Sequence, residues 1–313
     1  MAAAVLAVLL TGCSERTEQK AAEAGEKDVS ELSIGVVMKL YDEFQNEVMK
    51  GARDAAADLG CSISCAAPDN ITDAVQQVEL IENYMAQEVD ILLVNPNIAD
   101  AVLSVLEDAV KQGIKVVLVD TNSPKFKHPV TYIGTANYES AVAGAKVFAS
   151  KLPEGANVVI ATGIHGDDNH EKRSRGFRDA MEAEGCHVLD LQYCDNLADL
   201  TAMQVESWIQ KYGVDGIDAV MCTDDDAAMG AIQAIKQNGA TDRIKVCSFN
   251  GFRVAAQQIK AGNMEMTIAQ QPYKMGYDGV LCGVGAVGGR TYSRQIIMDV
   301  EIMDASNCDK YLK

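Results

Sequence analysis

Polar and charged residues follow short apolar runs at many points of this 313-residue sequence. Such runs, bounded by turn residues, indicate buried strands, and in open α/β sheets ligands bind beyond the carboxyl ends of the strands. The positions at those ends are Lys39, Asn95, Asp120, residues 163–169, Asp224, Asn250 and Gln270. Carboxylates and amides can each hold neighbouring hydroxyl groups, whereas none of the residues named singly carries a nucleophilic thiol or hydroxyl. The set therefore favours binding of a hydroxyl-rich molecule over bond-breaking chemistry.

The intervening sequence alternates between strand and helix patterns. A first group of strands is expected at residues 32–38, 61–67, 91–95, 115–120 and 130–133. A second group is expected at 156–162, 186–193, 219–223, 245–249 and 263–270, followed by closing strands at 295–299 and 300–304. The first helix is expected after residues 32–38 and ends at Gly60. Further helices are expected at 71–87, 100–112, 138–152, 172–184, 200–212, 227–238, 254–261 and 273–287. This order predicts two α/β domains with parallel sheets and no antiparallel hairpin domain.

Composition narrows the class of protein. With 48% hydrophobic and 23% charged residues, 25 glycines and 6 prolines, the chain has the balance of a folded globular protein. Its length favours two domains. The formal net charge is −18, and a surface this acidic repels phosphate backbones and anionic lipid. We therefore expect no nucleic-acid partner.

The N-terminus begins with a continuous apolar run from Met1 to Leu10, which is too short to span a bilayer. The run leads into Thr11, Gly12 and Cys13, and this sequence resembles a lipobox, in which a peptidase cuts before a cysteine that carries the lipid. We therefore expect a signal peptide over residues 1–12 and a lipidated tether over 13–31. Such a chain would be extracytoplasmic and would touch the cell membrane only through its lipid.

Eight further cysteines follow, at Cys61, Cys65, Cys186, Cys194, Cys222, Cys247, Cys282 and Cys308. An even number in an exported chain is compatible with disulfides. However, Cys222 and Cys247 lie in apolar runs, where a thiol behaves as a small hydrophobic group. Cys61 and Cys65 share an expected strand and would lie about 13 Å apart at about 3.3 Å per residue, too far for a disulfide. We expect mostly free thiols.

Eight phrases of the sequence occur in the order of one known family. They are IGVVMKLYDEFQNEVMKGARDAA, LLVNPNIADAV, VVLVDTN, YIGTANYESAVAGA, RSRGFRDAM, AVMCTDDDAAMGAI, CSFNGF and MTIAQQPYKMG. Over residues 32–303 the chain resembles the ribose-type periplasmic sugar-binding proteins of ABC importers, which are type I substrate-binding proteins. The resemblance implies an α/β fold of two Rossmann-like lobes and a three-segment hinge near residues 135–137, 270–271 and 299–300. The N-terminal lobe would comprise 32–135 plus 271–299, and the C-terminal lobe 136–270 plus 300–313.

The same resemblance implies a set of ligand contacts. They are Lys39, Asp42, Phe44, Asn95, Asp120, Asp168, Asn169, Glu171, Asp224, Asn250 and Gln270. Charge-assisted hydrogen bonds to a ligand are the strong ones in a closed cleft. The rings of Phe44 and Phe249 can stack on the apolar face of a sugar, or pack in the core.

The chain departs from the ribose binders at several of these positions. Lys39 replaces a small hydroxyl residue, Thr121 replaces an arginine, and Glu171 stands where a sugar-binding arginine is usual, with Arg173 left in a structural position. Gln45 and Asn196 each replace an aromatic residue. The pairing of Lys39 with Asp120, and the step from Asp168 to Asn169, resemble the furanosyl autoinducer-binding relatives, whereas Asp224 does not. A pentose, hexose, polyol, amino sugar or autoinducer-type ligand remains open.

Other motifs have simpler structural explanations. The group His165, Asp167, Asp168, His170 and Glu171 has metal-ligand types, but polar residues between a strand and a helix usually cap the helix or line a cleft. Asp224 to Asp226 could hold Mg²⁺, but a cleft residue followed by a helix N-terminus explains them. The pattern from Gly283 to Gly288 imitates a dinucleotide fingerprint but follows a helix. Lys39 and Asp120 are better explained as a binding ion pair than as an acid–base pair. We expect no enzyme activity, no metal and no cofactor.

These inferences predict a lipid-anchored monomer that captures a sugar or sugar-like molecule between its lobes and delivers it to an ABC permease. The alternative is a sensory binding protein of the same fold that presents a sugar, polyol or autoinducer-type ligand to a membrane receptor kinase or chemoreceptor. The fold does not distinguish the two, because the difference lies in the partner surface.

Overall fold

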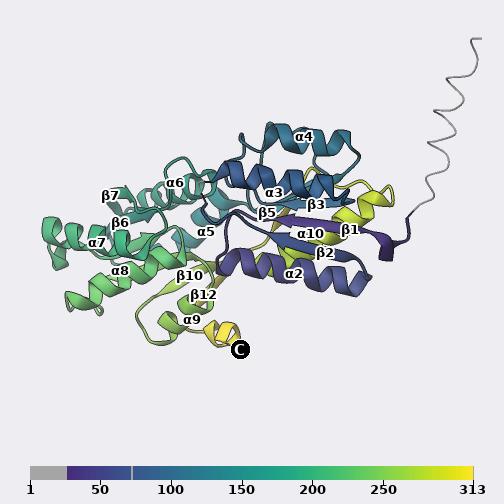
Figure 1. Cartoon of the computed structure of the whole chain (residues 1–313). Coiled ribbons are helices and arrows are strands. Elements are labelled where there is room, and N and C mark those ends of the chain that lie inside the picture. Colours follow the sequence, from purple (N-terminus) through teal and green to yellow (C-terminus); the bar gives the residue numbers. More distant parts are fainter. Residues whose placement is uncertain (1–26, 72, 313) are drawn as a thin grey trace, which may run out of the picture.

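The computed structural model describes residues 27–71 and 73–312 of the chain. They form two six-stranded sheets with helices on both faces of each (Figure 1). The expected signal peptide, Cys13 and most of the expected tether lie outside the described residues.

The first sheet has the strand order β11-β5-β4-β3-β1-β2, and its pairs are parallel. Its strands are β1 (Ser33–Val37), β2 (Ser62–Ala66), β3 (Ile91–Val94), β4 (Lys115–Val119), β5 (Thr131–Thr135) and β11 (Gln295–Met298). Its helices are α2 (Glu43–Leu59), α3 (Ala74–Ala86), α4 (Leu103–Lys111) and α10 (Pro272–Val287), after the short turn η1 (Val29–Glu31). Val36 packs with α2 and α10, whereas its neighbour Val37 packs with α3 and α4. Burial on both faces accounts for the uninterrupted apolar strands.

The second sheet has the order β12-β10-β9-β8-β6-β7. Its strands are β6 (Asn157–Thr162), β7 (His187–Tyr193), β8 (Ala219–Cys222), β9 (Lys245–Asn250), β10 (Met266–Ala269) and β12 (Glu301–Asp304). Its helices are α5 (Asn137–Ala149), α6 (Asp168–Ala183), α7 (Ala198–Tyr212), α8 (Asp225–Gln237) and α9 (Arg253–Lys260), with the turns η2 (Val214–Gly216) and η3 (Cys308–Leu312). Phe148 of α5 and Phe177 of α6 share one core cluster, and Trp208 of α7 belongs to the cluster on the other face. We call each sheet with its helices a lobe.

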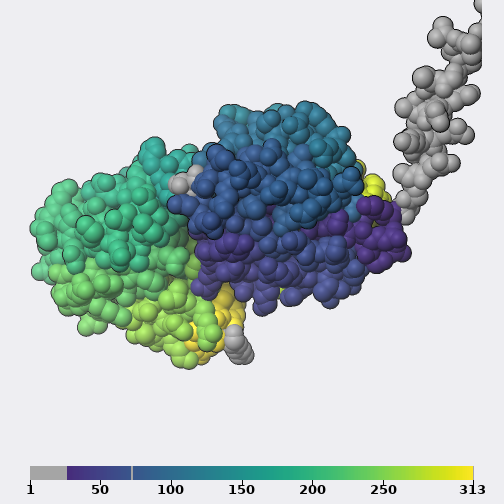
Figure 2. All heavy atoms as spheres, in the orientation of Figure 1, coloured from purple at the N-terminus to yellow at the C-terminus, as the bar shows by residue number. Residues whose placement is uncertain are grey.

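The chain passes between the lobes at three places. These are the β5–α5 junction at residue 136, residues 270–271 between β10 and α10, and residues 299–300 between β11 and β12. They coincide with the three hinge segments that the family resemblance implies. The lobes touch along the seam between them on the face shown in Figure 2, with the second lobe in teal to green and the first in purple to blue.

Strand β12 differs from the expected all-parallel pattern, because it pairs with β10 in antiparallel orientation. The chain enters the second lobe at the edge where its parallel strands end, so Glu301 pairs with Ala269, the last residue of β10. A strand that starts at that edge must run back against its neighbours.

Helix α6 begins at Asp168, four residues before the predicted start at 172. The cause is the N-cap Asp167, whose side chain accepts hydrogen bonds from the amides of Asn169 and His170. The other predicted helices are found within about three residues of their predicted ends.

The eight cysteines in the described part of the chain are unpaired, and six of them are buried. Within the same residues, none of the helices has both the length and the apolar character needed to cross a membrane.

Candidate functional site

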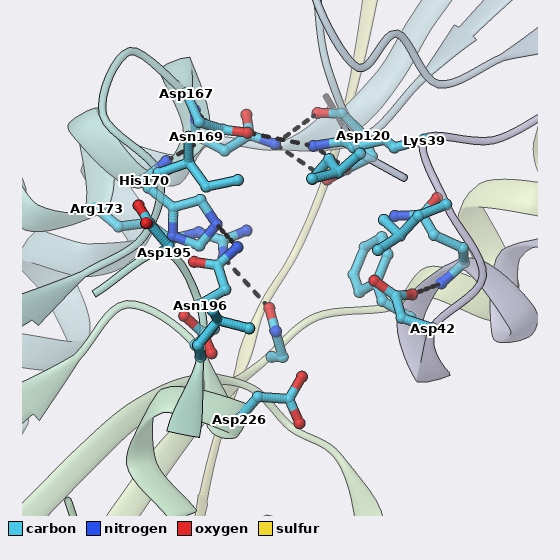
Figure 3. A pocket seen from close by; sticks show the side chains of 18 of the residues that line it. Lys39, Asp42, Asp120, Asp167, Asn169, His170, Arg173, Asp195, Asn196 and Asp226 are labelled. Atoms are coloured by element: carbon cyan, nitrogen blue, oxygen red, sulfur yellow. Dashed lines mark hydrogen bonds and ion pairs between the residues drawn. The ribbon is translucent and has the colours of Figure 1, made fainter. Parts of the chain in front are cut away.

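A cavity of about 220 Å³ lies between the lobes, where the carboxyl ends of their strands face each other (Figure 3). The first lobe contributes Lys39, Leu40, Asp42, Phe44, Gln45, Ile71 and Asp120. The second lobe contributes Ile164, Asp167, Asn169, His170, Arg173, Asp195, Asn196, Leu197, Asp224, Asp226, Asn250 and Phe252, and Gln270 lies at a crossing. This is the place where open α/β sheets bind ligands.

At one end of the cavity Lys39 bridges the two lobes. Its Nζ lies 3.2 Å from Asp120 Oδ2 of the first lobe and 3.7 Å from Asp167 Oδ2 of the second. Burial by itself lowers the pKa of a lysine, but the two carboxylates outweigh this effect and raise the pKa of Lys39 above its usual value. The amine therefore stays protonated. It can donate hydrogen bonds to oxygen atoms and cannot act as a general base.

Asp120 contacts three side chains at this end of the cavity, those of Lys39, Asn95 and Asn169. Its φ of 59° lies in the left-handed region, which aspartate tolerates better than most residues. Its Oδ1 accepts a hydrogen bond from Asn169 Nδ2 across the lobes at 3.3 Å, and its Oδ2 accepts one from Asn95 Nδ2 at 2.9 Å. We call Lys39, Asp120, Asp167 and Asn169 the paired end of the cavity.

Three cavity carboxylates also begin helices. Asp42 Oδ1 accepts from the amide of Gln45 at 2.6 Å at the start of α2, and Asp224 Oδ1 accepts from the amide of Ala227 at 2.7 Å at the start of α8. Asp167 does the same for α6. An aspartate N-cap accepts a hydrogen bond from an amide that the helix itself leaves free. Helix capping therefore fixes the positions of these three carboxylates at the cavity.

Asp224 and Asp225 are adjacent and buried, yet they differ in their partners. Asp225 accepts hydrogen bonds from two side-chain hydroxyls and from the amides of Gly251 and Phe252, at 2.8 and 2.7 Å. Asp224 Oδ2 is shielded from solvent and has no hydrogen-bond partner in the described structure. Burial raises the pKa of Asp224 to about 7. A buried oxygen without a donor is costly, and because Asp224 lines the cavity, a bound ligand can supply that donor.

Arg173 is fixed on several sides while it lines the cavity. Its guanidinium carbon lies 4.1 Å from the ring centroid of Phe249. Its Nε donates to Asn137 Oδ1 at 2.7 Å, and its Nη1 donates to Asn250 Oδ1 at 3.3 Å. Asn250 Oδ1 also accepts from Gln270 Nε2 at 2.8 Å, which ties the arginine to a crossing segment.

His170 is neutral in this site. Burial lowers its pKa to about 4. Its Nδ1 lies 2.9 Å from Thr223 Oγ1, and its Nε2 lies 3.2 Å from Asn196 Nδ2, which can only donate. Asn196 Oδ1 is left without a donor and is packed against Gly163, where an added Cβ would lie 2.1 Å from it.

Aromatic rings come from both lobes. Phe44 and Phe252 line the cavity and are 5% and 6% exposed. Phe249 was expected beside Phe44 as a possible stacking ring. It lies instead in the core cluster beneath Arg173 and does not line the cavity. Core packing, the alternative considered for that ring, is what the structure shows.

Eight of the eleven residues that the resemblance implied line the cavity: Lys39, Asp42, Phe44, Asp120, Asn169, Asp224, Asn250 and Gln270. Asn95 lies behind them, fully buried, with its amide hydrogens donated to Asp120 and Gln45. It positions both side chains and does not itself line the cavity.

Asp168 and Glu171 are not brought into the cavity. Asp168 pairs with Lys172 at the surface, 2.5 Å from its Nζ. Glu171 Oε1 accepts from Tyr193 Oη at 2.9 Å. Glu171 is two positions from both Asn169 and Arg173, and residues two apart on a helix do not share a face. Arg173, assigned a structural position from the sequence, therefore lines the cavity where Glu171 was expected.

The cavity is also lined by residues that were not predicted as contacts from the sequence, among them Gln45, Asp195, Asn196, Asp226 and Phe252. The signal available in the sequence was proximity, because Asp226 and Phe252 are each two residues after a strand-end residue that was assigned. The rule that ligands bind beyond the carboxyl ends of strands identifies the loop. Only the packed structure shows which residue of that loop faces the cavity.

The other motifs have structural roles. Among the described residues, no group of three or more His, Cys, Asp or Glu side chains could hold a metal ion. Gly283 lies inside α10, and a Cβ there would come 2.6 Å from Ile91 Cγ2. Its small size lets the helix pack on the sheet. The glycine pattern thus occupies the last residues of α10 and its C-cap Gly288, and does not follow the helix as expected.

Comparisons with known proteins agree with this geometry. The sequence profile of the periplasmic binding protein domain matches residues 34–291. The ribose import binding protein of Bacillus subtilis is 30% identical over 271 residues, which cover 86% of this chain and 86% of that protein. The D-ribose/D-allose-binding protein of Pseudomonas aeruginosa is 25% identical over 293 residues and 91% of each chain.

Solved structures show the same fold. A periplasmic solute-binding protein of an ABC transporter from Actinobacillus succinogenes, with bound D-allose, has a TM-score of 0.84 and 23% identity over 90% of this chain and 100% of its own. A solute-binding protein from Burkholderia graminis in complex with D-arabinose has a TM-score of 0.85 and 24% identity over 92% and 100%. The chain therefore belongs to the periplasmic binding protein family, in its ribose-type branch.

Proposed function

We propose that this chain is an extracytoplasmic, lipid-anchored binding protein that captures a sugar or sugar-like molecule between its lobes and delivers it to an ABC permease. The observation that carries the proposal is the interlobe cavity, in which the buried Asp224 Oδ2 has no hydrogen-bond donor. A hydroxyl group of a sugar supplies such a donor. Because contacts come from both lobes, the ligand stabilises the closed arrangement by its differential affinity for it.

The lining suits a sugar in a second way. Phe44 and Phe252 present rings from opposite lobes, and an aromatic face packs against the apolar C–H face of a sugar ring. Of the solved relatives named above, one has bound D-allose and the other is in complex with D-arabinose. Polar side chains for the hydroxyls and rings for the C–H groups together support a sugar-like ligand over a wholly apolar one.

Delivery and anchoring rest on the relatives and on the N-terminal sequence. The curated relatives include import binding proteins for ribose and fructose, and an import binding protein must pass its ligand to a membrane component. The segment from Leu10 to Cys13 resembles a lipobox, which supports attachment at Cys13.

A thermal-unfolding screen tests ligand capture. The panel contains pentoses, hexoses, inositols, amino sugars and autoinducer-type compounds. At about 100 times its Kd, a true ligand adds about 2.7 kcal/mol to the free energy of unfolding, which raises Tm by a few degrees. The stabilisation should persist in Asp108→Asn, which removes an exposed carboxylate on α4, and disappear in Asp120→Ala. If no compound stabilises protein shown by mass spectrometry to be ligand-free, capture of a sugar is refuted.

Cell fractionation tests anchoring. The wild-type chain should be found in the membrane fraction, with an intact mass that includes a diacylglyceryl group on Cys13. Cys13→Ser should lack the lipid and leave that fraction. An unmodified wild-type protein that still sediments with membranes would contradict the proposed anchor.

Stimulation of a permease tests delivery. The ligand-loaded protein should raise the ATPase rate of its ABC permease when that permease is reconstituted in vesicles. No stimulation by loaded protein, with the ligand shown to be bound, would favour the sensory alternative.

A further inference from the structure

The charges that line the cavity do not balance. Lys39 and Arg173 are the cations among the described lining residues, since burial lowers the pKa of His170 to about 4 and keeps its ring neutral near pH 7. Six carboxylates line the same space: Asp42, Asp120, Asp167, Asp195, Asp224 and Asp226. The lining therefore has more acidic than basic groups.

Both cations are already engaged. Lys39 is shared between Asp120 and Asp167. Arg173 donates to uncharged oxygens, at 2.7 Å to Asn137 Oδ1, 3.1 Å to the carbonyl of Thr223 and 3.3 Å to Asn250 Oδ1.

The remaining lining carboxylates have no such partner. Within the described residues, no lysine or arginine nitrogen lies within 4.0 Å of the carboxylates of Asp42, Asp195, Asp224 or Asp226. The excess of acidic groups is therefore located on these four side chains, of which Asp224, whose pKa is raised to about 7, is only partly ionised near neutral pH.

Three of these carboxylates are near neighbours, because the charge of Asp226 acts on both Asp42 and Asp224. Asp42 comes from the first lobe, and Asp224 and Asp226 come from the second. Figure 3 shows Asp42 and Asp226 on opposite sides of the open space. We call these three residues the acidic end.

Burial opposes ionisation at the acidic end. It is the largest cause that raises the pKa of Asp42 to about 6; the amide of Gln45 and the charge of Lys39 act against it, and the charges of Asp120 and Asp226 add to it. Burial and the charge of Glu43 raise the pKa of Asp226. Like charges that face each other across the lobes oppose closure until a cation or protons compensate them.

An independent observation indicates that a ligand group belongs at this end. Asp224 is 3% exposed, lines the cavity and has Oδ2 without a donor. A hydroxyl group can donate one hydrogen bond to it. An ammonium group can donate three, which are charge-assisted, and it also reduces the repulsion between the carboxylates. The geometry and the charge together favour the ammonium group.

We infer that the ligand of this cavity carries a positively charged amino group, held at the acidic end between Asp42 of the first lobe and Asp224 and Asp226 of the second. The inference rests on the proposed function and narrows its ligand class to amino sugars and amino polyols. The uncharged hydroxyls of the same ligand would bind Asn196, Asn250 and the paired end.

Titration calorimetry with matched pairs of sugars tests this inference on the purified full-length protein near neutral pH. The pairs are D-glucosamine with D-glucose, D-galactosamine with D-galactose and D-mannosamine with D-mannose. In a pair that binds, we expect the amino member to bind at least about tenfold more tightly, equal to about 1.4 kcal/mol. Asp224→Asn and Asp42→Asn should each reduce this ratio. The control Asp108→Asn also removes one carboxylate, but this side chain is exposed on α4, far from the cavity lining. It should leave the ratio unchanged.

The outcomes separate the inference from the proposed function. A neutral sugar or polyol that binds as tightly as its amino counterpart, or more tightly than every amino compound tested, overturns the inference and leaves sugar capture intact. An amino preference unchanged by both Asp224→Asn and Asp42→Asn overturns its assignment to the acidic end. Failure of every sugar and polyol to bind refutes the proposed function, and the inference with it.

Discussion

At the paired end of the cavity the two lobes bond to each other, whereas at the acidic end they oppose like charges. Asp120 meets Lys39, Asn95 and Asn169, so its carboxylate has donors from both lobes. Asp224 has its helix amide as a donor to Oδ1 and none to Oδ2. Both are buried aspartates that follow parallel strands, and the difference lies in what packs around them.

This difference assigns separate roles to the two ends. Contacts at the paired end join protein groups of the two lobes and contribute to the stability of the interlobe arrangement. The acidic end stores an unfavourable interaction that a suitable ligand removes, so it contributes to selectivity. Substitutions at the two ends should therefore change different measured quantities.

The largest expected effect is at the paired end, in Asp120→Asn. Asparagine tolerates the left-handed backbone of this position. The change removes the charge and also turns an NH2 group toward one of the two amide donors, Asn95 Nδ2 or Asn169 Nδ2. Lys39 is then left with Asp167 alone, at 3.7 Å. Breaking a buried ion pair costs 3–5 kcal/mol, and we expect about 3 kcal/mol because one partner remains. Guanidinium unfolding measures the loss, and calorimetry should show no binding of the ligand found in the screen.

The control for this prediction is Asp108→Asn, at an exposed pair with Lys111. Its free energy of unfolding should change by less than about 0.5 kcal/mol. If Asp120→Asn is as stable as this control, the paired end does not stabilise the lobes.

The next effect is a pH dependence at the acidic end, and its sign differs from that of a salt-bridged aspartate. The pKa of Asp224 is about 7 in the folded chain and near its ordinary value of 3.8 when unfolded. Between those values the folded chain keeps a proton that the unfolded chain has released. The free energy of unfolding therefore falls as the pH rises from about 4 to about 7.

Comparison of wild type with Asp224→Asn isolates this effect. His170, with a pKa of about 4 when folded, acts in the opposite direction because its unfolded form gains a proton below about pH 6.5. The stability of Asp224→Asn relative to wild type should increase from pH 4 to pH 7, by on the order of 2 kcal/mol. Chemical unfolding at a series of pH values measures it. A constant difference would show that Asp224 does not titrate in this range.

The sequence predicted the fold from local patterns, and eight of the twenty residues that line the cavity from those patterns together with the family resemblance. Continuous apolar strands and their polar ends are local patterns, and Asp120, Asp224 and Asn250 follow such strands. The antiparallel direction of β12 was not predictable in this way, because it depends on the side from which the chain enters the lobe. The acidic end was not predictable either, since a shortage of cations appears only when the partners of Lys39 and Arg173 are known.

A smaller effect is expected at Arg173, which lies between the two ends. In Arg173→Lys the amine cannot reproduce the planar fork that bonds Asn137 and Asn250 while it stacks on Phe249. We expect ligand affinity to fall about tenfold, or about 1.4 kcal/mol. The matched control is Arg175→Lys on the same helix, where the exposed side chain lies over Tyr138. Equal affinities of the two variants would contradict the role of Arg173.

The smallest effect is expected at Glu171, and it tests where the cavity ends along α6. The carboxylate accepts hydrogen bonds from Tyr193 Oη and the amide of Gly166, and the amide oxygen of Glu171→Gln can accept both. Ligand affinity should change by less than about 0.5 kcal/mol, the usual range for a surface substitution, whereas Asn169→Ala, two residues away on the cavity side, should weaken binding clearly. Calorimetry on both variants decides between the helix register seen here and the one expected from the family pattern. A large loss in Glu171→Gln with little in Asn169→Ala would mean that the ligand contacts the opposite face of α6, and would require the cavity to extend to Tyr193.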